Sequence, residues 1–214
     1  MIRVLICDDH LIVRQGIRLV LADAPDIAVV AEAADAADAT ARVREHMPDG
    51  LDVLLLDIAL PGRDGLDVLR QVKAEWPRLA VLVLSTYPDR QYAVRCLKLG
   101  AAGYLNKSAD SEPLIDAVRK AASGKRFITP HVAELLATAL QGPAGADEQP
   151  LHERLSHREH QVFRLLASGK SVGEIAQQLA LAPNTVSTYR ARILEKTGVR
   201  NDVDLALYAQ SHGL

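Results

Sequence analysis

A run of four apolar residues, Val53–Leu56, leads directly into Asp57. A short, uninterrupted apolar run predicts a strand that is buried on both faces, as in a parallel sheet. Because open α/β sheets bind ligands at the carboxyl ends of their strands, Asp57 is predicted to lie at a binding site. A single aspartate at such a position more often caps a turn. The interpretation therefore depends on which other residues reach the same edge.

Strands and helices are predicted to alternate five times over the first 124 residues. The predicted strands span 3–8, 27–33, 53–57, 80–85 and 103–106, and the predicted helices span 10–24, 36–45, 66–76, 90–99 and 112–124. This alternation favours an α/β doubly wound, five-stranded parallel sheet, for which 2-1-3-4-5 is a common strand order. In that order Asp8 and Asp9 lie beside Asp57, Ser85 ends the next strand, and Lys107 follows the last one.

Three carboxylates that converge at one sheet edge repel one another, so Asp8, Asp9 and Asp57 require a cation. Oxygen ligands with room for water suit Mg²⁺. A carboxylate can attack phosphorus and form an aspartyl-phosphate, with Lys107 and Ser85 placed to neutralise and bind the phosphoryl oxygens. Each residue alone has a simpler explanation, such as a helix cap, a solvated lysine or a strand-end hydroxyl. Their joint occurrence at successive strand ends favours a phosphoryl site.

An enzyme is the main alternative for this half of the chain. Phosphohydrolases resembling the haloacid dehalogenases also use a strand-end aspartate as nucleophile, but they need a second aspartate two residues later as acid and base. That position is Ala59 here. The sequence therefore favours a phosphoryl acceptor with slow self-dephosphorylation at most, and not a metabolic enzyme.

The residues Asp8-Asp9, Asp57, Ser85, Tyr104 and Lys107 resemble the motif set of the receiver domain of bacterial two-component response regulators, over about residues 2–123. The resemblance implies that Asp57 accepts a phosphoryl group from a sensor histidine kinase. It also implies that Asp8, Asp9, Asp57 and the backbone carbonyl of Ala59 bind Mg²⁺. On phosphorylation, Ser85 would move toward the phosphate and Tyr104, otherwise interpreted as a half-buried strand aromatic, would turn inward. Many receivers have proline after the lysine, whereas this chain has Ser108.

Composition is consistent with a cytoplasmic protein without a membrane partner. No window reaches the roughly 18 unbroken apolar residues of a membrane span, and the start of the chain lacks a signal-peptide pattern. The two cysteines, Cys7 and Cys96, cannot form a disulfide framework and are interpreted as reduced thiols. Residues 151–214 carry 8 Lys+Arg and 6 Asp+Glu, whereas residues 1–150 carry 17 and 21. This split weakly favours an anionic partner for the second half.

The domain boundary is predicted in a tether. Thr129 and Pro130 form an N-cap and N1 pair that starts a short amphipathic helix near 130–140. Residues 141–150 lack apolar periodicity and contain helix breakers, which indicates a flexible linker. We therefore assign a receiver domain to 1–124, a linker to 125–150 and a second domain to 151–214.

The second domain is predicted to be a bundle of four short helices. Ser156 and Glu159 form a capping box with Leu155 before it, and Ser171 begins the next helix. Pro183 begins the third helix, after a tight turn, and Asn201 or Asp202 begins the fourth. Two short helices joined by a tight turn are typical of a helix-turn-helix motif.

The third helix is predicted to bury Val186, Ile193 and Thr197 and to leave small polar residues on the opposite side. Such a face suits the major groove of double-stranded DNA, with flanking cations on phosphates. The predicted DNA-contacting residues are Asn184, Thr185, Ser187, Thr188, Tyr189, Arg190, Arg192 and Lys196. Arg190 projects near the core and is expected to extend its head group to the surface. The alternative is a helical bundle that binds protein.

Three segments of the second domain resemble the LuxR-type helix-turn-helix: 155–159, 174–176 and 184–186, together with Gly198-Val199. With the receiver, the whole chain resembles a NarL/FixJ-family response regulator. The resemblance implies that phosphorylation frees the third helix and favours a homodimer, for which Leu205 and Tyr208 are the candidate contact residues. The chain departs from the family pattern at Ser187, often Lys, at Tyr189, often His, and at Asp202, often Arg. Fewer cations on this helix predict a shallower salt dependence of DNA binding.

Overall fold

The computed structural model of the protein describes residues 1–60, 65–86, 89–107, 111–141, 151, 155–179 and 181–212. The chain divides into two compact units, Met1–Gly142 and Pro143–Leu214. Three features predicted from the sequence lie outside the described residues: most of the turn at 60–62, the departure at Ser108 and residues 142–150 of the tether.

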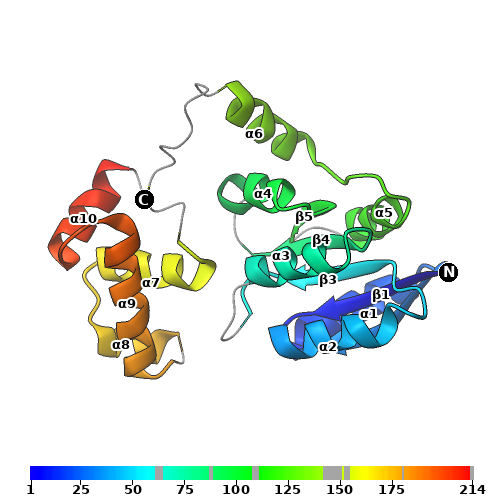
Figure 1. Cartoon of the computed structure of the whole chain (residues 1–214), viewed down its shortest axis with the longest axis horizontal. Coiled ribbons are helices and arrows are strands. Elements are labelled where there is room, and N and C mark those ends of the chain that lie inside the picture. The colour runs from blue at the N-terminus through cyan, green and yellow to red at the C-terminus, as the bar shows by residue number, and fades with distance from the viewer. Residues whose placement is uncertain are drawn as a thin grey trace. The chain divides into compact units, whose positions relative to one another are not determined.

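The first unit is built on a five-stranded parallel sheet (Figure 1). Its strands are β1 (Ile2–Cys7), β2 (Ile27–Ala33), β3 (Val53–Asp57), β4 (Ala80–Ser85) and β5 (Gly103–Asn106), in the order β2-β1-β3-β4-β5. Strand pairing places Cys7 opposite Leu56, Asp57 opposite Leu84 and Ser85 opposite Asn106. The carboxyl ends of β1, β3, β4 and β5 therefore lie along one edge, and the predicted strand order is confirmed.

Helices cover both faces of this sheet. They are α1 (Leu11–Ala22), α2 (Ala36–His46), α3 (Gly65–Glu75), α4 (Asp89–Lys98), α5 (Ser111–Ala122) and α6 (Pro130–Gln141). One face packs against α2, α3 and α4, and the other against α1 and α5. All five residues of β3 are buried, which is why its sequence is an unbroken apolar run instead of an alternating one.

The helix predicted inside the linker belongs to the first unit. Thr129 caps α6 as predicted, since its hydroxyl accepts the N–H of Val132 at 3.3 Å. Val132 is only 1% exposed and lies in the same buried cluster as Tyr92, Ala93 and Tyr104, and α6 contacts α4. The first compact unit therefore extends to Gly142 and not only to residue 124. An amphipathic pattern shows that a helix has an apolar face, but it does not show which element that face packs against.

The second unit contains α7 (His157–Ala167), α8 (Val172–Gln178), α9 (Pro183–Thr197) and α10 (Asp202–Ser211), which surround one apolar core. Capping boxes begin two of them, Ser156 with Glu159 on α7 and Ser171 with Glu174 on α8. Asn201 caps α10, which decides between the two predicted starts. Gly198 ends α9 with φ +69°, a left-handed conformation that glycine adopts without steric cost.

One prediction for α10 is wrong. Leu205 was assigned to a dimer surface, but it is 0% exposed and lies in the core of the second unit. Tyr208 is half-buried, stacks on His212 and meets Phe163 edge-on. The exposed apolar side chains of this helix are Val203 (69%) and Leu207 (60%).

Candidate functional site

The acid cluster at the sheet edge surrounds one lysine. The Lys107 Nζ lies 2.6 Å from Asp8 Oδ2 and 2.7 Å from Asp57 Oδ2. Both carboxylates are 1% exposed and the lysine side chain 9% exposed. The topology therefore brings together three residues that are 49 or more positions apart in the chain.

The remaining oxygens of the two aspartates are fixed by local backbone groups. Asp8 Oδ1 accepts the N–H of His10 at 2.9 Å, and Asp57 Oδ1 accepts the N–H of Ala59 at 3.0 Å. Asp8 therefore also caps the turn into α1, as the simpler explanation suggested. Because one oxygen of each carboxylate is held by backbone, the other is directed to Lys107.

Burial and charge oppose each other in this cluster. Burial raises the pKa of Asp57 above its usual value, and the Lys107 ammonium limits that rise. Burial would lower the pKa of Lys107, but Asp57 and Asp8 raise it. Burial also raises the pKa of the Cys7 thiol, with Asp57 and Asp8 adding to the rise. Cys7 and Cys96 are both buried, and neither forms a disulfide. The Lys107 ammonium, shared between Asp8 and Asp57, therefore offsets part of the cost of burying the two acids.

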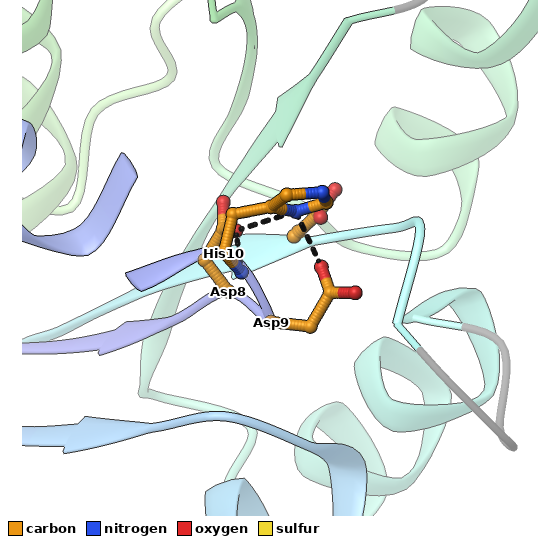
Figure 2. A group of neighbouring side chains, drawn as sticks. Asp8, Asp9 and His10 are labelled. Atoms are coloured by element: carbon orange, nitrogen blue, oxygen red, sulfur yellow. Dashed lines mark hydrogen bonds and ion pairs between the residues drawn. The ribbon is translucent and has the colours of Figure 1, made fainter. Parts of the chain in front are cut away.

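The donor set fits a divalent cation that prefers oxygen. Ligand atoms of Asp8, Asp9, His10 and Asp57 all lie within 4.8 Å of one another. Figure 2 shows Asp8, Asp9 and His10 gathered just after β1. Carboxylates with space for water suit Mg²⁺. Among the described side chains, Lys107 is shared by two of the three acids, which leaves net negative charge on this group. Ala59 lies next to this group through its N–H bond to Asp57.

His10 was not singled out from the sequence as part of this group. Its side chain is 67% exposed, with Nδ1 2.8 Å from Asp9 Oδ1 and 3.5 Å from Asp8 Oδ1. Its position directly after two aspartates was the available signal. The exposed imidazole therefore lies beside the carboxylates of Asp8 and Asp9 (Figure 2).

Ser85 and Tyr104 lie on the strands next to this cluster. Ser85 is 0% exposed at the end of β4, and its carbonyl accepts the N–H of Lys107 at 2.8 Å. Tyr104 is 1% exposed, so it is a core side chain in this structure and not a half-buried one. Ser85 therefore ends β4, the strand that pairs with β3, and Tyr104 lies on β5, the strand that leads to Lys107.

Gly65, at the start of α3, approaches the backbone of Asp57 closely. A Cβ at this position would lie 2.4 Å from the Asp57 carbonyl oxygen and 2.5 Å from the Ile58 Cα. Only glycine fits there without a backbone shift. The first turn of α3 is thereby held against the end of β3.

The exposed face of α9 carries the small polar residues predicted for it. Val186, Ile193 and Thr197 are buried as expected. A shallow hollow on the opposite side is lined by Asn184, Thr185, Thr188, Tyr189 and Arg192. Ser187 is also exposed, whereas Tyr189 is half-buried against the core.

Two predicted phosphate contacts have partners within the second unit. Arg190 Nε donates to Asp202 Oδ1 at 2.8 Å and to Oδ2 at 3.0 Å. Lys196 Nζ donates to Glu159 Oε2 at 2.6 Å. Asp202, which the sequence indicates as a departure from the family pattern and as a possible helix start, therefore pairs with a cation of α9. Arg192 is the predicted cation that lines the α9 hollow.

The sequence matches two family models that together span both units. Residues 4–119 match the response regulator receiver domain, and residues 153–209 match the luxR family of bacterial regulatory proteins. Response regulator GacA of Pseudomonas aeruginosa is 38% identical over 214 residues, covering 100% of this chain and 98% of that protein.

Solved structures of RcsB are similar over the whole chain. RcsB from Salmonella enterica serovar Typhimurium, bound to a promoter in the presence of the phosphomimetic BeF3−, is 29% identical; 97% of each chain is covered and the TM-score is 0.57. A structure of two RcsB dimers on two parallel DNAs is 30% identical, with 98% of each chain covered and a TM-score of 0.55.

The chain therefore belongs to the two-component response regulators that join a receiver domain to a LuxR-type helix-turn-helix domain. Within this class it is a member of the NarL/FixJ family. Among the described residues, no helix is both long and apolar enough to cross a membrane.

Proposed function

We propose that this protein is a phosphorylation-dependent transcriptional regulator in which Asp57 accepts a phosphoryl group from a sensor histidine kinase. The observation that carries the proposal is the buried Lys107 ammonium, which lies within 2.7 Å of both Asp8 and Asp57. A cation held at this point can bind and neutralise the oxygens of a phosphoryl group on Asp57. This matters because catalysis of phosphoryl transfer consists mainly of positioning the reacting groups and stabilising their charge.

The transfer is a displacement at phosphorus. An Asp57 carboxylate oxygen forms a new O–P bond while the P–N bond of the kinase phosphohistidine breaks, and the electron pair stays with the imidazole nitrogen. Lys107 neutralises charge on the phosphoryl oxygens, and the Ser85 hydroxyl donates a hydrogen bond to one of them. Asp8, Asp9, Asp57 and the Ala59 carbonyl would hold Mg²⁺, which when bound stabilises the negative charge of the transferring group. The protein is expected to act in the cytoplasm.

The coupling to the second half of the chain is proposed to run through α4 and α6. Tyr104 and Val132 belong to one buried cluster, and α6 leads into the tether. A phosphoryl group adds about −1.5 to −2 charges next to Lys107. When Lys107, Ser85 and Tyr104 rearrange, the side chains packed against Tyr104, including Val132 of α6, would shift with them. Phosphorylation would thereby bias an equilibrium between two arrangements of the receiver. The proposed result is a freed, dimeric helix-turn-helix domain.

The test of this function is DNA binding with and without phosphorylation. We expect acetyl phosphate with Mg²⁺ to increase affinity for promoter fragments selected from genomic DNA, and chelation of Mg²⁺ to remove the increase. The double variant Thr188→Ala/Arg192→Ala should still be phosphorylated but bind DNA at least about 30-fold more weakly, because two lost contacts at about 1–3 kcal/mol each cost about 2 kcal/mol or more.

A gel-shift titration at several salt concentrations measures both effects. Arg70→Ala removes the same charge from the receiver, where Arg70 pairs with Asp67, and serves as the control. Binding by Thr188→Ala/Arg192→Ala that matches this control would exclude α9 as the DNA-reading helix. Phosphorylation without any gain in affinity would favour the alternative of a protein-binding module.

The dimer contact is proposed for the exposed side of α10 instead of for Leu205. Val203 and Leu207 line an apolar hollow of about 530 Å³ between α7 and α10, together with Phe163 and Ala167. We expect Val203→Asp/Leu207→Asp to keep the phosphorylated protein monomeric in sedimentation experiments. Asp204→Asn, an exchange in the first turn of the same helix, should leave dimerisation unchanged. A phosphorylated dimer that survives the double exchange would place the contact elsewhere.

A further inference from the structure

Arg14 joins the acid cluster to the rest of the receiver. It lies on α1 and is largely buried, with 13% of its side chain exposed. Its Nη1 donates to the backbone carbonyl of Asp8 at 2.7 Å, and its Nε donates to Glu32 Oε2 on β2 at 3.2 Å. Arg14 therefore touches a residue of the proposed phosphoryl site without being part of the carboxylate group.

The main chain of Asp8 needs such support because it lies beyond the last pairing of β1. The pairing of β1 with both neighbours ends at Cys7. The Asp8 N–H donates to the Ala33 carbonyl at 3.1 Å, which fixes one side of the residue. Arg14 fixes the other side through the carbonyl. A charge-assisted hydrogen bond from a guanidinium is shorter and stronger than a neutral one.

Glu32 in turn orients Arg14. Its two oxygens receive different arginines: Oε2 accepts Arg14, and Oε1 lies 3.6 Å from Arg18, whose side chain is 69% exposed. Glu32 pairs with Ile6 across β1 and β2, so its backbone is fixed by the sheet. The order of contacts is Glu32, then Arg14, then the carbonyl of Asp8.

We infer that Arg14 is a positioning residue of the phosphoryl site, and that it sets the direction of the Asp8 carboxylate toward Lys107 and the divalent cation. Groups that orient metal ligands typically change metal affinity by about 10- to 100-fold when they are removed. The inference rests on the proposed function, because it assigns Arg14 to the same site.

The experiment measures Mg²⁺ binding by calorimetry on the full chain, without phosphoryl donor, and then the labelling rate with acetyl phosphate. We expect Arg14→Ala to weaken Mg²⁺ binding about tenfold, in line with other ligand-orienting groups, and to slow labelling. Arg14→Lys, which can still donate to the Asp8 carbonyl, should recover most of the affinity. Glu32→Gln should weaken binding less than Arg14→Ala, and it provides a second measurement if Arg14→Ala does not fold.

Arg18→Ala is the matched control, because it removes a cation from the same Glu32 without touching Asp8. It should bind Mg²⁺ like the unchanged protein. The inference is overturned if Arg14→Ala lowers only the melting temperature while Mg²⁺ affinity and labelling of the folded protein stay unchanged, or if Arg18→Ala weakens Mg²⁺ binding equally. Absence of labelling in the unchanged protein would instead remove the proposed function, and the Mg²⁺ titration would still decide the role of Arg14.

Discussion

Asp57→Asn is expected to abolish phosphorylation of this protein while leaving the receiver folded. The amide of asparagine is a far weaker nucleophile than a carboxylate, so the O–P bond cannot form at this position. Asp8 is held much as Asp57 is, with one oxygen on the His10 N–H and the other against Lys107. Its proposed role, like that of Asp9, is to hold Mg²⁺. We therefore expect no second residue to accept the group.

The fold should tolerate the exchange because of the electrostatics of the site. Burial raises the pKa of Asp57, which means that folding disfavours its charged form. A neutral side chain of the same size removes this cost. The asparagine carbonyl can still accept the N–H of Ala59, and Asp8 remains 2.6 Å from Lys107. The melting temperature of Asp57→Asn should therefore not fall substantially.

Intact-protein mass spectrometry after incubation with acetyl phosphate and Mg²⁺ measures the labelling directly. Asp67→Asn is the matched control, since Asp67 is a surface acid of α3 that pairs with Arg70. It should be labelled at the normal rate. Retained labelling of Asp57→Asn with a normal melting curve would contradict the assignment of Asp57 as the acceptor.

The sequence was sufficient to predict the sheet and the convergence at its edge for a specific reason. The buried run Val53–Leu56 has no polar interruption, and a parallel sheet brings all strand carboxyl ends to one edge. The proximity of Asp8, Asp57 and Lys107 then follows from strand order alone, since all three lie at strand ends. Side-chain detail was not needed for that step.

Side-chain partners from different elements could not be predicted in this way. Arg14 and Glu32 are ordinary surface charges in the sequence, and their link to Asp8 depends on how α1 crosses the sheet. The pairs Arg190 with Asp202 and Lys196 with Glu159 likewise join residues on different helices. Distances of this kind are set by packing, which periodicity does not encode.

The fourth helix of the second domain shows a different limit. Apolar residues at 203, 205, 207 and 209 fall on two opposite sides of α10, with Leu205 and Ala209 inward and Val203 and Leu207 outward. When apolar residues lie on both sides of a helix, the pattern does not indicate which side is buried. The sequence pattern therefore did not reveal that Leu205 is buried in the core.

The second large effect is expected from Glu159→Ala in the helix-turn-helix domain. Glu159 is 3% exposed, accepts the N–H of Ser156 at 2.7 Å and pairs with Lys196 at 2.6 Å. It thus closes the capping box of α7 and also holds the last turn of α9. Removal of one partner of a buried pair costs about 3–5 kcal/mol. Because Lys196 is 38% exposed and can be rehydrated, we expect about 2–4 kcal/mol, including about 1 kcal/mol for the cap.

The domain itself provides the matched control. Glu174 closes the capping box of α8 in the same way, but it is exposed and caps Ser171 without a lysine ion pair among the described contacts. Glu174→Ala should therefore cost only about 1 kcal/mol, the value of a cap alone. Chemical unfolding followed by circular dichroism gives both values. Trp76, the only tryptophan of the sequence, lies in the first unit. Its fluorescence should therefore report an unfolding transition of the receiver that is unchanged in both variants.

The same pair predicts the acid sensitivity of the second domain. Burial alone would raise the pKa of Glu159, but the hydrogen bonds from Lys196 and Ser156 lower it below its usual value of 4.5. A carboxyl group whose pKa is lower in the folded state stabilises the fold above the unfolded pKa, and this stabilisation is lost as the pH falls through the folded value. The domain should therefore lose stability below about pH 4.5, and Glu159→Gln should flatten this loss.

Equal costs for Glu159→Ala and Glu174→Ala would show that the link to Lys196 adds nothing to the cap, and that α9 is held in place by its apolar contacts alone.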